Sequence, residues 1–212
     1  MSRYTGAEMA VSLTSALAAT TACIAILGCF IPGKTSANDM DSRTEIGFAI
    51  AEHQGIELDR DNKAQGLGSY LVNTAGCNDC HTWPNYAPGG NPFLRQPKQV
   101  PLTNFLAGGR LFALPTEKIC SRNLSPALGT HRPAGLSRAD FYYVLRTGCD
   151  PQDANFRDPQ RCELLQVMPW PNYQEMSKQD LNAIYSFLSA LPHTEPGAAA
   201  QCAPAPQGVA GE

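Results

Sequence analysis

The sequence contains little charge and no excess of basic residues. Only 17% of its 212 residues are charged, and 16 Lys and Arg stand against 19 Asp and Glu. A nucleic-acid-binding protein presents clustered basic residues to the phosphates, so this balance predicts no nucleic-acid partner. The chain also lacks internal repeats. Its apolar content of 43% is enough for one globular domain with a core of its own.

Charge is absent altogether from residue 9 to residue 33. This run follows Arg3 and ends just before the small residues Thr35-Ser36-Ala37, as a secretory signal peptide does before its cleavage site. We assign residues 1–37 to a cleaved signal peptide and expect the protein in the periplasm or another exported location. Two alternatives stay open. Uncleaved, the run is long enough to anchor the chain in a membrane. The sequence Ile26-Leu27-Gly28-Cys29 also loosely resembles a lipobox, which would place a lipid on its cysteine.

Three segments carry signals for helices. Residues 63–75 combine an apolar face with small glycines. Ser137 and Ser177 are typical N-cap residues, each followed by an aspartate three positions later and then by an apolar face. These caps predict one helix that ends at Gly148 and a last helix that ends at about Leu191.

Seventeen prolines and 18 glycines predict long loops between these helices. We expect an all-α fold with little β structure, limited to a short extended run at 110–114, in one domain over residues 62–192. Residues 38–61 are predicted to be a polar lead-in with a short helix at 46–50. Residues 193–212 are predicted to be a flexible tail rich in Ala, Pro and Gly.

The sequence Cys77-Asn78-Asp79-Cys80-His81 is the C-x-x-C-H signature of c-type haem attachment. Two thiols three positions apart on a helical turn can each add across one vinyl group of the porphyrin. The histidine that follows is then held beneath the iron as the proximal ligand. We therefore expect one haem c, bound covalently at Cys77 and Cys80, with His81 on the iron.

Two other sites use a C-x-x-C pair, and the sequence argues against both. A thioredoxin-like redox pair follows a strand and opens a helix, whereas the segment before Cys77 is predicted to be helical. A structural zinc site needs a second Cys or His pair at close spacing, and the sequence contains none.

Met168 is the predicted ligand on the other side of the iron. It lies in a loop braced by Pro169 and Pro171, ahead of the last helix, from which its thioether can reach across the haem. Met176 is a second, less favoured candidate for this ligand, because it precedes the N-cap and can pack on Leu181 as a hydrophobic staple instead. A methionine ligand raises the reduction potential. The remaining alternatives are an open site or one of three histidines: His53, His131 and His193.

Outside the first 37 residues and the haem motif, four cysteines remain, which are Cys120, Cys149, Cys162 and Cys202. An even number in an exported protein predicts two disulfides. Of the three connectivities we favour Cys149–Cys162, which closes the polar insertion between them, with Cys120–Cys202 securing the tail. Four free thiols are the alternative. A second metal site is less favoured, because no close Cys or His partner accompanies any of the four.

Aromatic and polar side chains are also candidates for the haem surroundings. Four aromatic residues are predicted to wall the pocket: Trp83, Tyr86, Trp170 and Tyr173. Arg122 and Asn123 either hydrogen-bond a haem propionate or lie in a solvent-facing turn, and the sequence leaves both readings open.

The order of these features resembles class I cytochrome c: a first helix with glycine and aromatic residues, the C-x-x-C-H motif, a long loop, the Met168-Pro169 loop and a C-terminal helix. The resemblance covers about residues 62–192 and implies the cytochrome c fold. In that family the first and last helices cross, and a glycine allows their close approach. Gly66 or Gly68 would have that role here.

Three stretches are similar to bacterial cytochrome subunits that take electrons from periplasmic alcohol or sugar dehydrogenases, and these are residues 121–126, 141–148 and 168–171. Such subunits commonly carry three haems, whereas this chain has one C-x-x-C-H motif. The insertion between Cys149 and Cys162 also lies outside their pattern.

Together these features predict a monohaem c-type cytochrome that carries single electrons in the periplasm and transforms no substrate of its own. Its expected partners are redox proteins, namely dehydrogenases, oxidases or other cytochromes. One alternative is a cytochrome subunit of a membrane or periplasmic dehydrogenase or oxidase complex. Another is a haem-based sensor or a peroxidase-like enzyme, which would need a vacant or displaceable sixth position on the iron.

Overall fold

The computed structural model describes residues 35–196 and residue 202, all of which belong to one compact unit over residues 34–212. The charge-free run at 9–33 and the cysteine of the lipobox-like sequence lie outside the described residues. Within the described part, no helix is both long and apolar enough to cross a membrane. The signal-peptide, anchor and lipid-attachment predictions therefore stay predictions.

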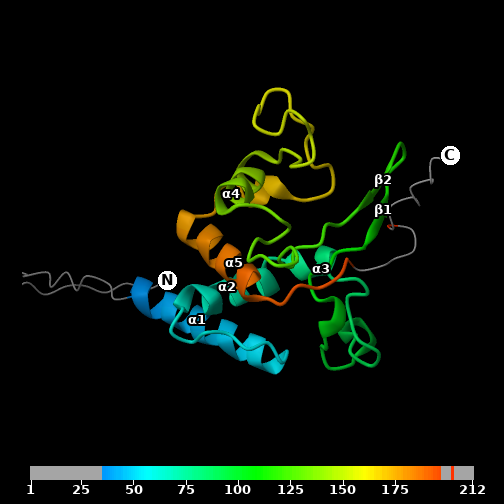
Figure 1. The fold of residues 1–212 in the computed structure, drawn as a ribbon. Coiled ribbons are helices and arrows are strands. Elements are labelled where there is room, and N and C mark those ends of the chain that lie inside the picture. The colour runs from blue at the N-terminus through cyan, green and yellow to red at the C-terminus, as the bar shows by residue number, and fades with distance from the viewer. Residues whose placement is uncertain (1–34, 197–201, 203–212) are drawn as a thin grey trace, which may run out of the picture. The chain divides into compact units, whose positions relative to one another are not determined.

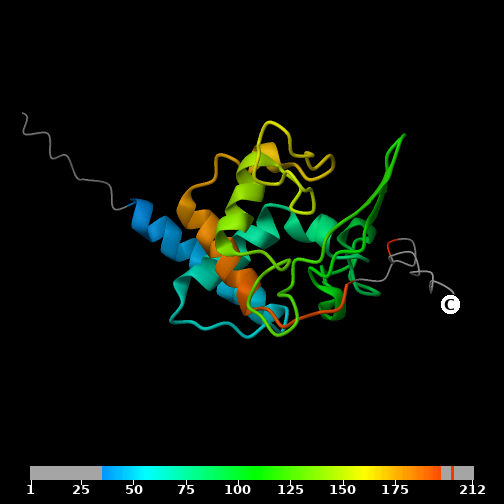
Figure 2. The ribbon, with the colours of Figure 1, turned by 45° about the horizontal axis from the view of Figure 1, so that its top comes forward.

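The described part is mostly helical (Figure 1). The α-helices are α1 (Thr35–His53), α2 (Lys63–Thr74), α3 (Cys77–His81), α4 (Arg138–Thr147) and α5 (Lys178–Ala190). Three short 3-10 helices, Pro92–Leu94, Leu102–Asn104 and Trp170–Asn172, interrupt the loops. The strands β1 (Leu111–Ala113) and β2 (Lys118–Cys120) pair antiparallel, with Phe112 opposite Ile119. Figure 2 shows this hairpin extending away from the helices. A mainly helical fold with little β structure is thus confirmed.

The capping predictions for α4 and α5 are confirmed. The Oγ of Ser137 accepts a hydrogen bond from the main-chain N–H of Asp140, and the Oγ of Ser177 accepts one from that of Asp180. Gly148 ends α4 with φ at 72°, a left-handed conformation that glycine adopts without steric cost. These local signals operate within a few residues, so the surrounding structure did not override them.

The lead-in prediction for residues 38–61 is wrong in one respect. In place of a short helix at 46–50, α1 runs for 19 residues from Thr35, so the predicted cleavage position after Ala37 falls in its first turn. The buried face of α1 is narrow and partly made of small residues, including Thr44, Phe48 and Ala51. Such a face lacks the stripe of large apolar residues that normally identifies a helix in a sequence.

Helix α2 packs against α1 on one side and against α5 on the other. Two glycines make both contacts close. A Cβ atom on Gly66 would lie 2.8 Å from the main-chain oxygen of Thr44 in α1, and one on Gly68 would lie 2.0 Å from that of Ala183 in α5. The sequence left open whether Gly66 or Gly68 allows the first and last helices to approach closely. Gly68 lies at the crossing of α2 with α5, whereas Gly66 allows the close approach of α1.

The core extends from these crossings to α4 and to the loop before β1. Its fully enclosed members are Val72, Leu106, Leu181, Phe187 and Leu188. A hydrogen bond from the main-chain N–H of Leu106 to the Oγ1 of buried Thr82 ties this core to the residue just after α3, at 3.0 Å. The core thereby fixes the position of the C-x-x-C-H segment.

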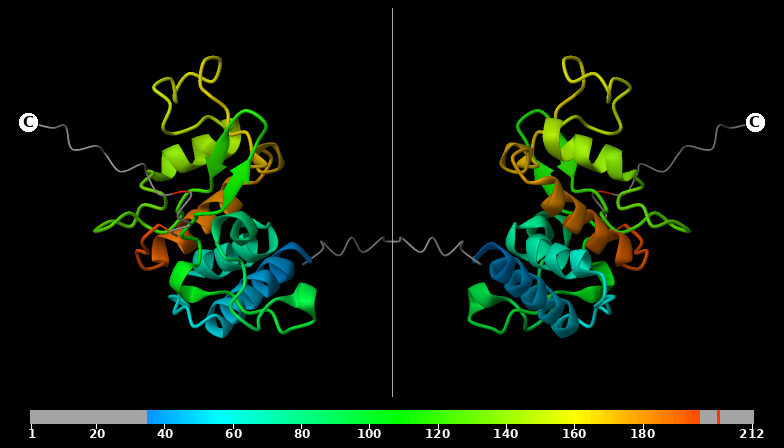
Figure 3. Two further views of the ribbon diagram at one scale, coloured as in Figure 1. Left: turned by 90° about the vertical axis from the view of Figure 1, so that its right-hand side faces the viewer. Right: turned by 90° about the vertical axis from the view of Figure 1, so that its left-hand side faces the viewer.

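Both favoured disulfides are present. Cys149 pairs with Cys162 and Cys120 with Cys202, with Cα–Cα distances of 5.5 and 5.7 Å. The loop closed by the first lies on the far side of α4 from α1 (Figure 3). After α5 the chain runs along residues 123–126, where the carbonyl of Thr194 accepts hydrogen bonds from the side chains of Asn123 and Ser125 at 2.7 and 3.1 Å.

Candidate functional site

The C-x-x-C-H residues form the short helix α3 directly after α2. Gly76, with φ at 78°, makes the left-handed turn that separates the two helices. Cys77, Cys80 and His81 all line the same cavity. One turn of helix thus presents two sulfur atoms and an imidazole to one space, as the spacing of the motif predicts.

A main-chain carbonyl orients the ring of His81. Its Nδ1 lies 2.7 Å from the carbonyl oxygen of Arg122, and because a carbonyl can only accept, Nδ1 carries the proton. Burial lowers the pKa of His81, against the opposing effect of this hydrogen bond, so the ring is neutral at about pH 7. A neutral ring protonated on Nδ1 keeps a free lone pair on Nε2, which is the state of a histidine ready to bind a metal.

The cavity has a volume of about 590 Å³, within the range of roughly 300–1,000 Å³ that small-molecule and cofactor sites occupy. It is bounded by α3, β2, α4, α5 and the loop at 163–169. Apolar side chains make up much of its wall, among them Ile119, Leu124, Leu136, Phe141, Val144, Leu145, Ile184 and Leu188. Such walls exclude water and favour a large apolar ligand.

Met168 and Met176 both line this cavity. Met176, the less favoured candidate, therefore shares the cavity with Met168, and its main-chain carbonyl accepts a hydrogen bond from Arg146. None of the alternative histidines is part of the wall. His131 and His193 are hydrogen-bonded through Nδ1 to the carbonyls of Ser189 and Pro126, and His53 is exposed at the end of α1.

Of the four aromatic residues predicted to wall the haem pocket, one is part of the cavity wall. Tyr173 lines the cavity and donates a hydrogen bond to the carbonyl of Ala75, just before α3, at 3.0 Å. Trp83 is 41% exposed and lies under the guanidinium of Arg110. Tyr86 packs edge-on against Phe93. Trp170 packs against Gly148 at the end of α4, where a Cβ would lie 2.3 Å from its ring. The sequence carries no signal of these long-range packing choices.

The two cysteines of α3 are the free cysteines of the described part, where Cys120, Cys149, Cys162 and Cys202 are all paired. Burial raises the pKa of Cys77 to about 12 and also raises that of Cys80. The attacking cysteine of a thioredoxin-like pair needs the opposite shift, towards thiolate. Among the described residues, no three His, Cys, Asp or Glu side chains gather as a zinc site requires. What the two cysteines share is a position beside an apolar cavity, where a large apolar group could lie against both sulfur atoms.

Arg122 has a role in the structure that the sequence did not predict. The predicted alternatives were a propionate contact and a solvent-facing turn, yet its carbonyl orients His81 from 41 positions away. Its guanidinium pairs with Asp150 at 2.6 Å, and both side chains line the cavity. The side-chain amide of Asn123 donates a hydrogen bond to the carbonyl of Thr194.

No protein-family model, no curated protein and no solved structure matches this chain. What the site can hold therefore follows from its residues. Two free thiols, a neutral imidazole with Nε2 available, two thioethers and an apolar cavity form a donor set that fits a covalently attached haem.

Proposed function

We propose that this protein is a monohaem c-type cytochrome, a one-electron carrier that works outside the cytoplasm. The observation that carries the proposal is the arrangement at α3. Cys77 and Cys80 stay free while four other cysteines pair, and they share an apolar cavity with His81. Two thiols and an imidazole on one helical turn beside an apolar cavity are the groups that covalent haem attachment requires.

In this proposal each thiol adds its sulfur to one carbon of a vinyl group and its hydrogen to the other, leaving two thioether bonds and no leaving group. His81 is the proximal ligand, bound through Nε2 because its Nδ1 is committed to the carbonyl of Arg122. That hydrogen bond keeps the ring in one tautomer and one orientation.

Met168 is the proposed distal ligand. It lies in the wall of the cavity on the loop at 163–169, whereas His81 lies on α3. The thioether favours the ferrous state and so raises the reduction potential. Met176 also lines the cavity, so the assignment of Met168 as the ligand has to be tested against Met176.

The crossing of α2 and α5 at Gly68 supports the finer fold proposal, a cytochrome c fold over residues 62–192. The first helix of that fold meets the last at a glycine, and here a side chain on Gly68 would collide with the backbone of α5. Helix α1 is an addition to this pattern, packed on the other side of α2.

When bound, the haem supplies a one-electron couple between ferric and ferrous iron. The apolar wall would keep water from the site, and His81 and Met168 would hold the iron. The proposed partners are dehydrogenases, oxidases or other cytochromes, and two disulfides support an exported location.

The proposal is tested on the exported protein by a pyridine haemochrome spectrum together with its intact mass. We expect one haem per chain, retained in acid acetone, and a mass increase of one haem. The Cys77→Ala/Cys80→Ala variant should lose covalent haem. A Cys120→Ser/Cys202→Ser variant, which also removes two cysteines, should keep it. A colourless protein, or a pigment extracted by acid acetone, would refute the proposal.

A further inference from the structure

The segment that carries Met168 is held close to the end of α4. After Gly148 the chain leaves into the loop at 149–163 and returns antiparallel to its own start. The main-chain N–H of Asp150 donates to the carbonyl of Glu163, and that of Leu165 donates to the carbonyl of Gly148, both at 2.8 Å. Cys149 and Leu164 pair between these two bonds.

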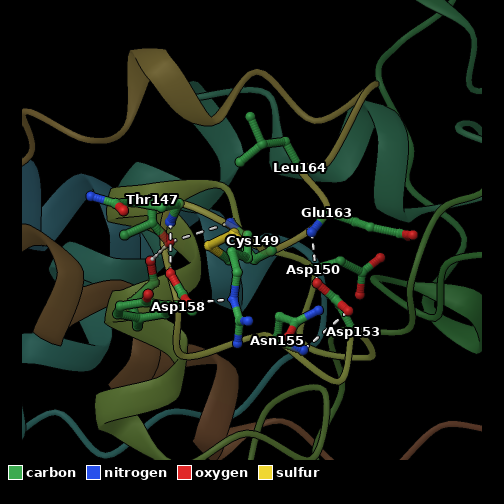
Figure 4. The surroundings of a disulfide bond; sticks show 12 residues. Thr147, Cys149, Asp150, Asp153, Asn155, Asp158, Glu163 and Leu164 are labelled. Carbon is green, nitrogen blue, oxygen red and sulfur yellow. Dashed lines mark hydrogen bonds and ion pairs between the residues drawn. A yellow bond between two sulfur atoms is a disulfide. The ribbon is translucent and has the colours of Figure 1, made fainter.

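The Cys149–Cys162 disulfide closes the same loop at its base (Figure 4). Cys149 is fully buried, so the crosslink is anchored in the interior. Asp153 reinforces the loop from inside, since its carboxylate accepts a hydrogen bond from the main-chain N–H of Glu163 at 2.7 Å. The segment at 163–165 is therefore held in a fixed position a few residues before Met168.

Asp150 also connects this base to the opposite wall of the cavity. Its carboxylate pairs with the guanidinium of Arg122 at 2.6 Å, and the two side chains are only 31% and 28% exposed. The carbonyl of Arg122 is the group that orients His81. One ion pair thus joins the segment behind the proximal histidine to the segment that leads to Met168.

Beyond this base, the Met168 segment has little other support from the backbone. Among the described residues, no backbone hydrogen bond joins residues 166–168 to α4, α5 or the β hairpin. The next anchor is Trp170, packed against Gly148. Met168 therefore lies on a short span between two fixed points, one at residues 163–165 and one at Trp170.

We infer that the Cys149–Cys162 disulfide and the Arg122–Asp150 ion pair form a clamp that holds Met168 in position against the iron. The inference rests on the proposed function. Arg122, Asp150 and the two cysteines are positioning residues, because they act on the distal ligand through the segment at 163–165. Loss of the clamp would release Met168 more often while leaving His81 and the thioether bonds in place.

The test compares holoprotein variants by two readouts, the long-wavelength ferric absorption band of sulfur-ligated iron and carbon monoxide binding to the ferrous form. Carbon monoxide binds only when Met168 has left, so its apparent affinity rises in proportion to the open fraction. Removal of the disulfide that closes a loop of this length, in Cys149→Ser/Cys162→Ser, should strengthen carbon monoxide binding by about 10- to 100-fold. Loss of a partly exposed ion pair in Asp150→Asn should strengthen it by about two- to fivefold.

Cys120→Ser/Cys202→Ser is the matched control, because it also removes one disulfide, but one whose cysteines lie outside the loop at 149–163 and its base. We expect its ferric band and carbon monoxide affinity to equal those of the unmodified protein. The inference is overturned if Cys149→Ser/Cys162→Ser, folded by circular dichroism, binds carbon monoxide no more tightly than this control. If that variant does not fold, an unchanged affinity in Asp150→Asn overturns it.

Failure of the proposed function would look different. In that case the unmodified protein itself would hold no covalent haem or would show no sulfur-ligated ferric band. A normal band in the unmodified protein with no response in either variant refutes the clamp alone.

Discussion

Substitution of Gly68 by alanine tests the helix crossing on which the position of α3 depends. The new Cβ would lie 2.0 Å from the carbonyl oxygen of Ala183 and 2.6 Å from the Cβ of Phe187. Ordinary contacts of this kind exceed 3.4 Å, and the nearest atom belongs to a helix backbone that cannot rotate away. Helices α2 and α5 would have to separate at their closest point.

The expected cost follows from two opposing effects. Overpacking against backbone costs about 3 kcal/mol, whereas replacing a helical glycine by alanine contributes about 1 kcal/mol of helix propensity. The net loss is about 2 kcal/mol, which for a domain of this size lowers the melting temperature by about 4–8 °C.

The assay is denaturant unfolding followed by circular dichroism, with Thr74→Ala as the control. Thr74 is exposed at the end of the same helix, so its replacement by alanine tests propensity without touching the crossing. We expect the control to change the free energy of unfolding by less than about 0.5 kcal/mol. If Gly68→Ala were as stable as the control, the close approach of α2 and α5 would be refuted.

Two further predictions concern the distal ligand and pH. Met168→Ala should abolish the sulfur-ligated ferric band and lower the reduction potential, whereas Met176→Ala should mainly change stability. If absorption spectra showed the band lost in Met176→Ala and kept in Met168→Ala, Met176 would be the ligand. The pKa of His193 is raised, first by its hydrogen bond to a main-chain carbonyl and then by Glu195. The charged ring therefore stabilises the folded state fully below about pH 6, and this stabilisation is lost as pH rises through the folded-state pKa. The difference in unfolding midpoint between the unmodified protein and His193→Gln should therefore be larger at about pH 5 than at about pH 8, and equal differences would contradict the shift.

Some errors of the sequence reading have a common cause. Helix α1 was underestimated because its face against α2 consists largely of small residues, which carry no strong apolar period. Trp83 and Trp170 are predicted to wall the pocket, yet one is partly exposed and the other fills the space beside Gly148. In each case the deciding partner is distant in the sequence.

The sequence by itself determined the features whose physics is local. The caps at Ser137 and Ser177 act over three residues, and the spacing of Cys77, Cys80 and His81 is set by one helical turn. Such signals survive in any surroundings, because the groups that satisfy one another are joined by a few bonds of the same chain.

Only the tertiary structure decided which distant groups meet. It selected the carbonyl of Arg122 for His81, brought Met176 into the cavity beside Met168, and joined Arg122 to Asp150. The pairing of the four disulfide cysteines, favoured from the sequence among three connectivities, also became definite only there. These contacts depend on the packing of α5 against α2 and α4. That packing is the sum of many weak interactions between distant parts of the chain, so no local sequence pattern reveals it.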